Sequence, residues 1–467
     1  MRASAVILLS ALVCSIATRS WAQPSLQKES FLLTDTEAIG VLPADMAASG
    51  EVESAKWSSD GRYALIFRTV FRLSPNQLKG YLSQSLNIAP GETVITVWDN
   101  KARQSQDVWK RPFGGGRIMR VEWLPGTAIA LVMVETLESP TEPGGRPRSH
   151  FGVLRVNAAT GISKPLVDDA QGDAWQLEVS PVLPLSLIRY MERPVAGTVA
   201  PGGARVRAPA QEGLLLLRDD GNIGKRIPLP SGLFLYEVVW AADGSPILRT
   251  AARGQPGSNV VRKSYTMEPR TGLTSEVSPE PPLFAKPPDA VSVRLKNTSV
   301  EVSEKGAAHK VPFLWLESAV PSERPVTLVA PNASMGAISP GGDAILYRSN
   351  GAAWVAPLMR LTKSEYARLI GQIERTGAIE KAKQLASALQ KYAVDNNDTL
   401  PSAGTDVNDS ISPYLKMSGV FEGFSYTFRG GPLSGVNSPG TTEMGFVTGP
   451  GGRAVIFVDG HVTWRSD

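Results

Sequence analysis

The chain has 467 residues, of which 42% are hydrophobic and 20% charged, a composition typical of a globular protein with a buried core. The 48 Lys and Arg against 44 Asp and Glu give a net charge of +4, which is too small to argue for a nucleic-acid or anionic-surface partner. The length predicts two or three domains, and 44 Gly with 36 Pro indicate many turns.

Residues 1–22 are predicted to be a secretory signal peptide. Arg2 supplies a positive start, residues 5–17 are apolar, and Ser20-Trp-Ala22 offers a small-x-small cleavage site before Gln23. The apolar run is shorter than the roughly 20 residues that span a bilayer, so a retained anchor is the less favoured alternative. We therefore expect an exported protein, periplasmic or extracellular, with no membrane span after signal cleavage.

Cleavage would change both the charge and the cysteine content. Loss of Arg2 and Arg19 lowers the net charge from +4 to +2, and loss of Cys14 removes the only cysteine. The mature chain then has no disulfide, thiolate metal site or cysteine nucleophile. An exported protein without disulfides is more typical of bacteria than of animal secretion.

Residues 30–360 contain a degenerate repeat. The clearest copy, Ala55-Lys-Trp-Ser-Ser-Asp-Gly-Arg-Tyr-Ala-Leu-Ile66, places a polar turn between two strand-like runs. Weaker copies of strand, turn and strand begin at Val121, Leu177, Val239 and Ala337. Further strands are expected between the copies, at residues 93–99, 151–156, 214–217, 291–295 and 311–316.

Strands in groups of about four, repeated along the chain, are typical of a β-propeller. We predict a mainly β chain with about six blades. The last unit, residues 335–358, shows three strands, so an N-terminal strand near residues 38–42 is expected to complete it. An open, unclosed stack is the alternative.

The Trp-Ser-Ser-Asp-Gly-Arg-Tyr stretch resembles the WD40-like (PD40-type) repeats of TolB-type β-propellers, whose common form is Trp-Ser-Pro-Asp-Gly. The resemblance covers one good copy and the weaker ones, and it implies a fold rather than a reaction. In each copy the Asp-Gly or Pro-Gly pair is interpreted as part of a turn. Asp60, Asp243 and Asp343 are therefore expected to be structural.

Insertions interrupt the repeats. Residues 139–147 and 201–209 are rich in Pro and Gly and are expected to be exposed loops. Arg146 and Arg148 make the first loop basic; solvated charge is the favoured interpretation over a basic rim for an acidic partner. A short helix is expected within residues 73–89.

A long helix is predicted after residue 361. Thr362-Lys-Ser-Glu365 forms a capping box, and apolar residues then recur at helical spacing up to Tyr392, with Gly377 as a possible break. Asp395-Asn-Asn-Asp398 is expected to end the helix, and Pro401 prevents its resumption.

The chain closes with Arg453-Ala-Val-Ile-Phe-Val-Asp-Gly-His-Val-Thr-Trp464. An Asp-Gly pair between strand-like runs predicts a hairpin with a type I′ turn at Asp459-Gly460.

Residues 361–467 resemble type II secretion pseudopilins and the related prepilin-type proteins named for a His-x9-Asp-Gly motif. The likeness rests on the helix with Tyr392, the Asp-Asn turn, Pro401 and the terminal hairpin, whose Asp459, Gly460 and His461 match the end of the motif. It implies a small α+β pilin-like module, a helix laid on an antiparallel sheet. The His of the motif falls on Gly449, and a propeller replaces the membrane-inserted helix of pilins.

The sequence indicates no catalytic residue and no cofactor. His150, His309 and His461 are far apart and lack zinc-site spacing. Asp395, Asn397 and Asp398 are the candidate calcium ligands, because hard cations prefer oxygen, although a helix-ending turn is the favoured interpretation.

We expect a non-enzymatic binding or scaffold protein of the bacterial envelope that uses its propeller to bind protein partners. One alternative is an accessory component of a type II secretion or type IV pilus-like system, which rests on the family resemblance. Another is a hydrolase or lyase that uses the central channel of the propeller.

Overall fold

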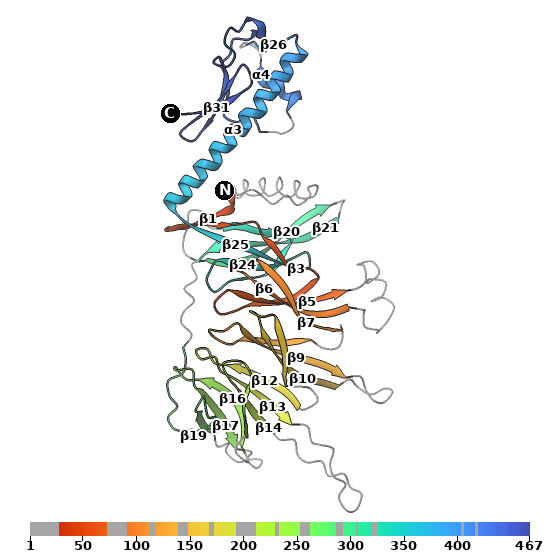
Figure 1. Ribbon diagram of the computed structural model, residues 1–467, viewed down its shortest axis with the longest axis vertical. Helices are drawn as coiled ribbons and strands as arrows, with labels where there is room; N and C mark the ends of the chain where they lie inside the picture. The colour runs from red at the N-terminus through yellow and green to blue at the C-terminus, as the bar shows by residue number, and fades with distance from the viewer. Residues whose placement is uncertain are drawn as a thin grey trace, which may run out of the picture. The chain divides into compact units, whose positions relative to one another are not determined.

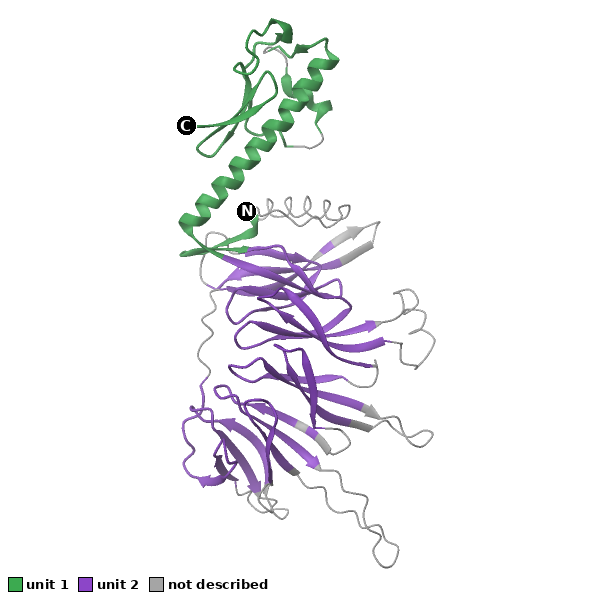
Figure 2. Ribbon diagram, in the orientation of Figure 1, with its two compact units in different colours: residues 1–40, 360–467 green, residues 41–359 purple. Residues whose placement is uncertain are grey.

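The computed structural model describes residues 28–71, 91–112, 117–138, 148–167, 172–192, 212–228, 233–252, 262–285, 293–304, 307–319, 326–402, 406–415 and 419–467 (Figure 1). Two compact units divide the chain, with residues 1–40 and 360–467 in unit 1 and residues 41–359 in unit 2 (Figure 2). The predicted signal peptide, the predicted helix in residues 73–89 and both predicted loops lie outside the described residues. None of the described helices is long and apolar enough to cross a membrane.

Unit 2 consists of antiparallel sheets in chain order (Figure 1). Sheet 1 contains β4 (Glu51–Trp57), β5 (Tyr63–Phe71), β6 (Gly91–Asp99) and β7 (Gln104–Pro112). Sheet 2 contains β8 (Ile118–Trp123), β9 (Ile129–Glu138), β10 (Arg148–Asn157) and β11 (Ile162–Val167). Sheet 3 contains β12 (Gly172–Val179), β13 (Ser186–Glu192), β14 (Glu212–Leu217) and β15 (Ile223–Pro228).

The remaining sheets of unit 2 are less uniform. Sheet 4 contains β16 (Leu233–Trp240), β17 (Pro246–Ala252), β18 (Arg262–Met267) and β19 (Thr274–Val277). Sheet 5 contains β20 (Val293–Glu304), β21 (Ala307–Ser318) and β22 (Val326–Pro331). Sheet 6 contains β23 (Ala333–Ile338), β24 (Ala344–Ser349) and β25 (Ala352–Thr362), and it is joined by the N-terminal strands β1 (Phe31–Leu33), β2 (Glu37–Val41) and β3 (Asp45–Ala48).

Neighbouring sheets bury apolar faces against each other. Separate clusters lie between sheets 1 and 2, 2 and 3, 3 and 4, and 6 and 1. Because both faces of a strand are covered, its apolar residues form a continuous run rather than an alternation, as in Leu214 to Leu217 of β14. The chain is thus mainly β, with four-stranded antiparallel sheets that are consistent with propeller blades, as predicted.

The repeat motif joins one sheet to the next. Trp57 Nε1 donates a hydrogen bond to the carbonyl oxygen of Ala337 (3.1 Å), and Trp123 Nε1 donates to that of Lys56 (3.3 Å). Trp57 thereby connects sheet 1 to sheet 6, and Trp123 connects sheet 2 to sheet 1. Both bonds join the first strands of the two sheets.

The motif aspartates are structural, as predicted. Asp60 accepts hydrogen bonds from the hydroxyl of Ser58 (2.6 Å) and the amide of Arg62 (3.1 Å), which closes the turn between β4 and β5. Asp243 accepts from the amide of Ser245, and Asp343 from the hydroxyl of Ser339.

An N-terminal strand does complete sheet 6. Two N-terminal strands neighbour β25: β2 (Glu37–Val41), which covers the predicted segment, and β3, which pairs from Ala48 opposite Ala353 to Asp45 opposite Val355. Within the predicted segment, the amide of Leu42 donates to the carbonyl oxygen of Pro357 (2.9 Å).

Unit 1 is built from both ends of the chain. β1 (Phe31–Leu33) pairs with β2 (Glu37–Val41), and their Phe31 and Ala38 bury Ile370 near the start of the long helix. Residues 31–40 were assigned by sequence to the repeat body, whereas the described contacts group them with residues 360–467.

The rest of unit 1 is one long helix on a small sheet. Helix α3 (Lys363–Asp395) begins with the predicted capping box and continues through Gly377 without a break. The short helix α4 (Val407–Ile411) follows. The antiparallel sheet contains β27 (Phe424–Tyr426), β29 (Glu443–Gly449), β30 (Gly452–Phe457) and β31 (Val462–Ser466), and β26 (Thr399–Leu400) pairs with β28 (Gly431–Pro432).

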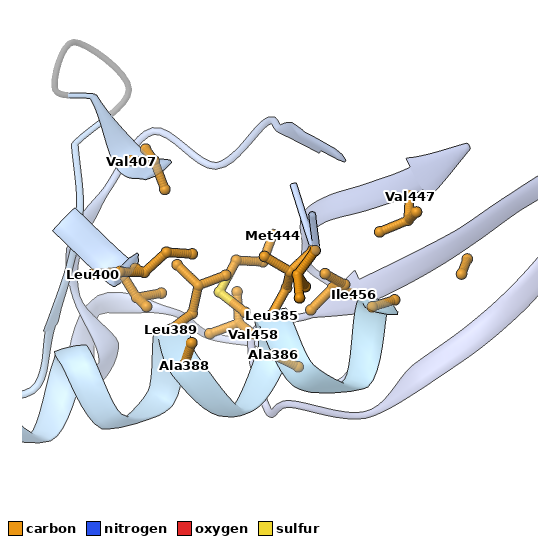
Figure 3. Packing of buried hydrophobic residues seen from close by; sticks show 14 of the residues in the cluster. Leu385, Ala386, Ala388, Leu389, Leu400, Val407, Met444, Val447, Ile456 and Val458 are labelled. Carbon is orange, nitrogen blue, oxygen red and sulfur yellow. The ribbon is translucent and has the colours of Figure 1, made fainter. Parts of the chain in front are cut away.

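Helix and sheet share one apolar core. Figure 3 shows Leu385 and Leu389 of α3 beside Met444, Ile456 and Val458. The small residues on the helix face, of which Ala382 and Ala386 are fully or almost fully buried, let the helix approach the sheet closely.

The terminal hairpin forms, but the type I′ prediction is wrong. Asp459 does not adopt positive φ, whereas Gly460 does, at 89°. The amide of Gly460 donates to the carbonyl of Phe457 (2.8 Å), and that of Phe457 to the carbonyl of His461 (3.0 Å). The connection is therefore longer than two residues, with glycine in the left-handed position. A side chain at Gly460 would also overlap Gln390.

The indole bonds between sheets lead to a stability prediction. Replacing Trp57 by Phe keeps the ring apolar but leaves the carbonyl of Ala337 without its donor, so we expect a loss of about 1–2 kcal/mol in the free energy of unfolding. Urea titration followed by circular dichroism measures it. Trp123→Phe should lose a similar amount, whereas two unchanged midpoints would show that these bonds do not hold the sheets together.

Candidate functional site

The candidate binding site of unit 2 is a cavity of about 410 Å³ between sheets 1 and 2, here called the inter-sheet cleft. Strand β7 forms one wall and strands β9, β10 and β11 form the other. Its lining is Trp109, Lys110, Arg111, Val134, Thr136, Gly152, Val153, Leu154, Ser163, Pro165 and Val167. The volume is within the range of small-molecule and peptide side-chain pockets.

Local irregularities in the strands create the cleft. The pairing of β6 with β7 shifts register between Ile95 and Thr96, and this places Trp109 opposite Ile95, whose side chain belongs to the core between sheets 1 and 2. Trp109 packs on the edge of that core and remains half-buried. On the other wall, Gly152 has no side chain to fill the space beside the carbonyl of Val167.

The charged side chains of the cleft lining, Lys110 and Arg111, are both cationic. Arg111 Nη1 donates to the hydroxyl of Thr136 (2.6 Å), which holds the guanidinium across the cleft. The hydroxyl of Ser163 donates to the carbonyl of Val108 (2.7 Å) and ties β11 to β7. Lys110, also in the lining, forms an ion pair with Asp107 at 3.1 Å.

An indole, a fixed guanidinium and an apolar floor suit one class of ligand. The apolar floor and Trp109 bury an aromatic or aliphatic body, while Arg111 recognises a carboxylate with its planar donors. The arrangement can therefore bind an anionic, amphipathic group.

A second charged feature, here called the charge ladder, crosses the first strands of sheets 1 to 3. Lys56 pairs with Glu122 (2.8 Å), and Glu122 also accepts from Arg120 (3.0 Å). Arg120 continues to Glu178 (3.3 Å), which accepts a hydrogen bond from Gln176 (3.0 Å). Burial alone would lower the pKa of Arg120, but Glu122 and Glu178 hold this pKa above its usual value. The ladder consists of charges that neutralise one another.

In sheet 4 one arginine holds two carboxylates. Arg249 binds Glu280 with two parallel hydrogen bonds (2.9 and 2.7 Å) and Glu237 with a third (2.9 Å). The Arg249 guanidinium, with the hydroxyl of Ser264, lowers the pKa of Glu280 to about 2. This clamp fixes the segment that follows β19.

Of the predicted calcium ligands, Asp395 is the last residue of α3, and Asn397 and Asp398 lie in the turn that follows. Asp395 accepts a hydrogen bond from the hydroxyl of Tyr414 (2.8 Å), and Asn397 and Asp398 both adopt positive φ. Among the described residues, no three His, Cys, Asp or Glu side chains are grouped as a metal site would require. The turn ends the helix, as the favoured interpretation held.

The predicted motif residues Asp459, Gly460 and His461 lie in the terminal hairpin. Asp459 accepts from the backbone amide of His461 (3.1 Å) and lies 2.5 Å from its Nδ1, and these contacts lower the pKa of Asp459. The His461 ring stacks on Phe457 at 4.2 Å. The three residues stabilise the turn locally.

The other two histidines lie apart in sequence, on different sheets. His150 is opposite Thr136 in the register of β10 and β9, and His309 is opposite Val302 in β21 and β20. His150 is thus the cross-strand neighbour of a cleft residue. The cleft was not predicted from the sequence. The sequence does contain one signal for it, Val108-Trp-Lys-Arg111, in which an aromatic residue lies between a β-branched residue and two cations.

The Arg249 clamp generates a pH prediction. The pKa of Glu280 is about 2 when folded and near 4.5 when unfolded, so its contribution to stability is complete above about pH 4.5 and is lost as the pH falls towards 2. Glu280→Gln should therefore lower the unfolding midpoint at pH 7, and its deficit should shrink between pH 4.5 and 2. Thermal unfolding measured across this range tests the prediction, with Glu276→Gln in β19 of the same sheet as a control for a carboxylate that pairs with Lys263 rather than with Arg249. A deficit that does not change with pH would contradict it.

Comparisons with known proteins do not assign a family. No protein-family model matches the chain, and no curated protein is detectably similar in sequence. Among solved structures, the tricorn protease is 10% identical with a TM-score of 0.31 and covers 86% of this chain and 41% of its own. Oligogalacturonate lyase from Vibrio parahaemolyticus is 12% identical with a TM-score of 0.24, over 70% of this chain and 96% of its own. An α-L-arabinofuranosidase of Fusarium graminearum is 11% identical with a TM-score of 0.26, over 68% and 98%. TM-scores this low carry no argument about fold or function.

Proposed function

We propose that the chain is an exported, non-enzymatic binding protein of the bacterial envelope. Its six sheets form a TolB-like β-propeller that binds an acidic segment of a protein partner in the inter-sheet cleft. The observation that carries the proposal is the pairing of Trp109 with Arg111 over an apolar floor. An acidic peptide with one aromatic or aliphatic side chain matches both parts of the lining.

The charge ladder favours a binding function over a hydrolytic one, because its charged groups pair with one another along the first strands of sheets 1 to 3. Its acids and bases are bonded to one another, from Lys56 through Glu122 and Arg120 to Glu178. A general acid or base needs access to a substrate proton, and these groups instead connect the sheets. The ladder therefore ties together the first strands of sheets 1 to 3.

A second candidate function is an accessory role in a type II secretion or type IV pilus-like system. What supports it is the packing of α3 on a four-stranded antiparallel sheet, with Ala382, Leu385 and Leu389 buried at the contact. The pilin-like resemblance implies this arrangement. We expect chemical crosslinking in the envelope to join the full chain to a pseudopilin, and recovery of no secretion-system component would rule this role out.

The cleft proposal is tested with short fluorescent peptides that carry two Glu residues beside one Phe, titrated against the mature chain. We expect binding to be about tenfold weaker for Arg111→Gln, because the variant keeps a side-chain N–H donor for Thr136 but loses the charge-assisted bond. Lys101→Gln, in an exposed turn of the same sheet, is the matched control. Fluorescence anisotropy measures the affinity.

Two outcomes would contradict the cleft proposal. The first is equal affinity for a peptide in which Gln replaces both Glu residues, since Arg111 would then recognise no charge. The second is equal weakening by Lys101→Gln, which would indicate attraction to the whole surface rather than to the cleft.

A further inference from the structure

Among the described residues sheet 5 has three strands, and the position without a strand can be identified. In sheets 1, 2, 3 and 6, the fourth strand is followed after two to five residues by the first strand of the neighbouring sheet, as β7 is by β8 and β11 by β12. In sheet 5, β22 is followed by β23 after one residue. β22 therefore holds the fourth position, and β20 and β21 hold the second and third.

The register of the strands gives the same assignment independently. In all five other sheets of unit 2, the first strand shifts register against the second. The second and third strands pair without a shift in every one of them. β20 and β21 pair over twelve residues without a shift, whereas β21 and β22 shift between Leu314 and Trp315. The missing strand is the first.

The chain before β20 is poorly suited to supply this strand. First strands are six to eight residues long elsewhere. Residues 282–284 are already bound to sheet 4, since Phe284 donates to the carbonyl of Trp240 (2.9 Å) and Ala242 to that of Pro282 (2.8 Å). Residues 286–292 read Lys-Pro-Pro-Asp-Ala-Val-Ser. Adjacent residues of a strand direct their N–H groups to opposite sides, so one of two consecutive prolines would leave a ladder bond unmade.

The edge of β20 is chemically distinctive. Among the described residues, β20 pairs with β21 alone, so about half of its backbone N–H and C=O groups face the vacant position. Arg294 and Lys296 extend from one face of β20, are 67% and 51% exposed, and share the carboxylate of Glu317 at 3.2 and 3.5 Å. On the other face Val293 is buried and Leu295 half-buried.

We propose that the free edge of β20 is a docking site for an extended segment of a partner protein, which adds to sheet 5 as its first strand, antiparallel to β20. Main-chain hydrogen bonds supply the affinity in such strand addition, and alternate side chains supply the specificity. Two cations against one carboxylate favour acidic residues on one face of the incoming strand, and Leu295 favours apolar residues on the other. The site is separate from the inter-sheet cleft.

The test uses an acetylated, amidated peptide of alternating Glu and Val, seven residues long and labelled with fluorescein, titrated against the mature chain at pH 7. We expect it to bind, and a Lys-Val peptide not to bind. Methylation of alternate backbone nitrogens should abolish binding, because it removes the donors along one edge of the peptide. Hydrogen exchange of residues 293–304 should slow only when the Glu-Val peptide is present.

Two variants separate the edge from general electrostatics. Lys296→Glu should weaken binding about threefold or more, since it replaces an attractive cross-strand pair by a repulsive one. Lys101→Glu makes the same charge change in a turn of sheet 1 and should have no such effect. Circular dichroism shows whether both variants remain folded.

Three results would overturn the proposal. Equal binding of the N-methylated peptide would mean that charge alone holds it. Protection, without peptide, of those β20 amides that do not bond β21 would mean that the chain fills the position itself. Failure of the Glu-Val peptide to bind would mean that Arg294 and Lys296 only guard the edge against pairing.

Discussion

The fold of unit 2 depends on apolar packing between neighbouring sheets, seen in the clusters between sheets 1 and 2, 2 and 3, 3 and 4, and 6 and 1. A strand covered on both sides has no polar face, and this explains the unbroken apolar runs of the middle strands, such as Leu214 to Leu217. Specific bonds must then set how the sheets are aligned, because apolar packing is not directional. The indoles of Trp57 and Trp123 and the charge ladder supply those bonds at the first strands. The cleft lies where the apolar packing between sheets 1 and 2 gives way, at Gly152 and the edge of Trp109.

Features encoded within a few residues were predictable from sequence. The Ser58-to-Asp60 turn and the Thr362-to-Glu365 capping box each need only neighbours in the chain, and both form as expected. Interactions between distant residues were not predictable: Arg111 meets Thr136 from the next sheet, and Arg249 meets Glu280 across 31 positions of sequence. The type I′ assignment failed for a related reason. A dipeptide does not fix loop length, and in the structure the side chain of Asp459 bonds the amide of His461 in a longer connection.

The N-terminal strands pack against elements that are distant in sequence. β3 joins sheet 6, and Phe31 of β1 packs with Ile370 and Tyr366 of α3, with the rings of Phe31 and Tyr366 5.2 Å apart. The first half of α3 carries Leu369, Ile370 and Ile373 towards this hairpin, whereas the second half carries an alanine-rich face towards the C-terminal sheet. One helix thus has two apolar faces of different character, and the larger side chains occur where it packs against β1 and β2.

Register shifts are a more reliable guide to strand position than strand number is. A register shift inserts one residue on one strand and bends that strand. Such bends recur at the same place in related sheets when the strand must bend at the same position in each of them. In unit 2 a register shift occurs between the first and second strands, where the first strand ends in the turn motif. The second and third strands pair over their whole shared length without a shift. Counting strands alone would describe sheet 5 as a blade with its last strand lost. The uninterrupted pairing of β20 with β21 shows instead that, among the described strands, the vacant position is beside β20. Arg294 and Lys296 lie at this edge, which in every other sheet of unit 2 is covered by a first strand.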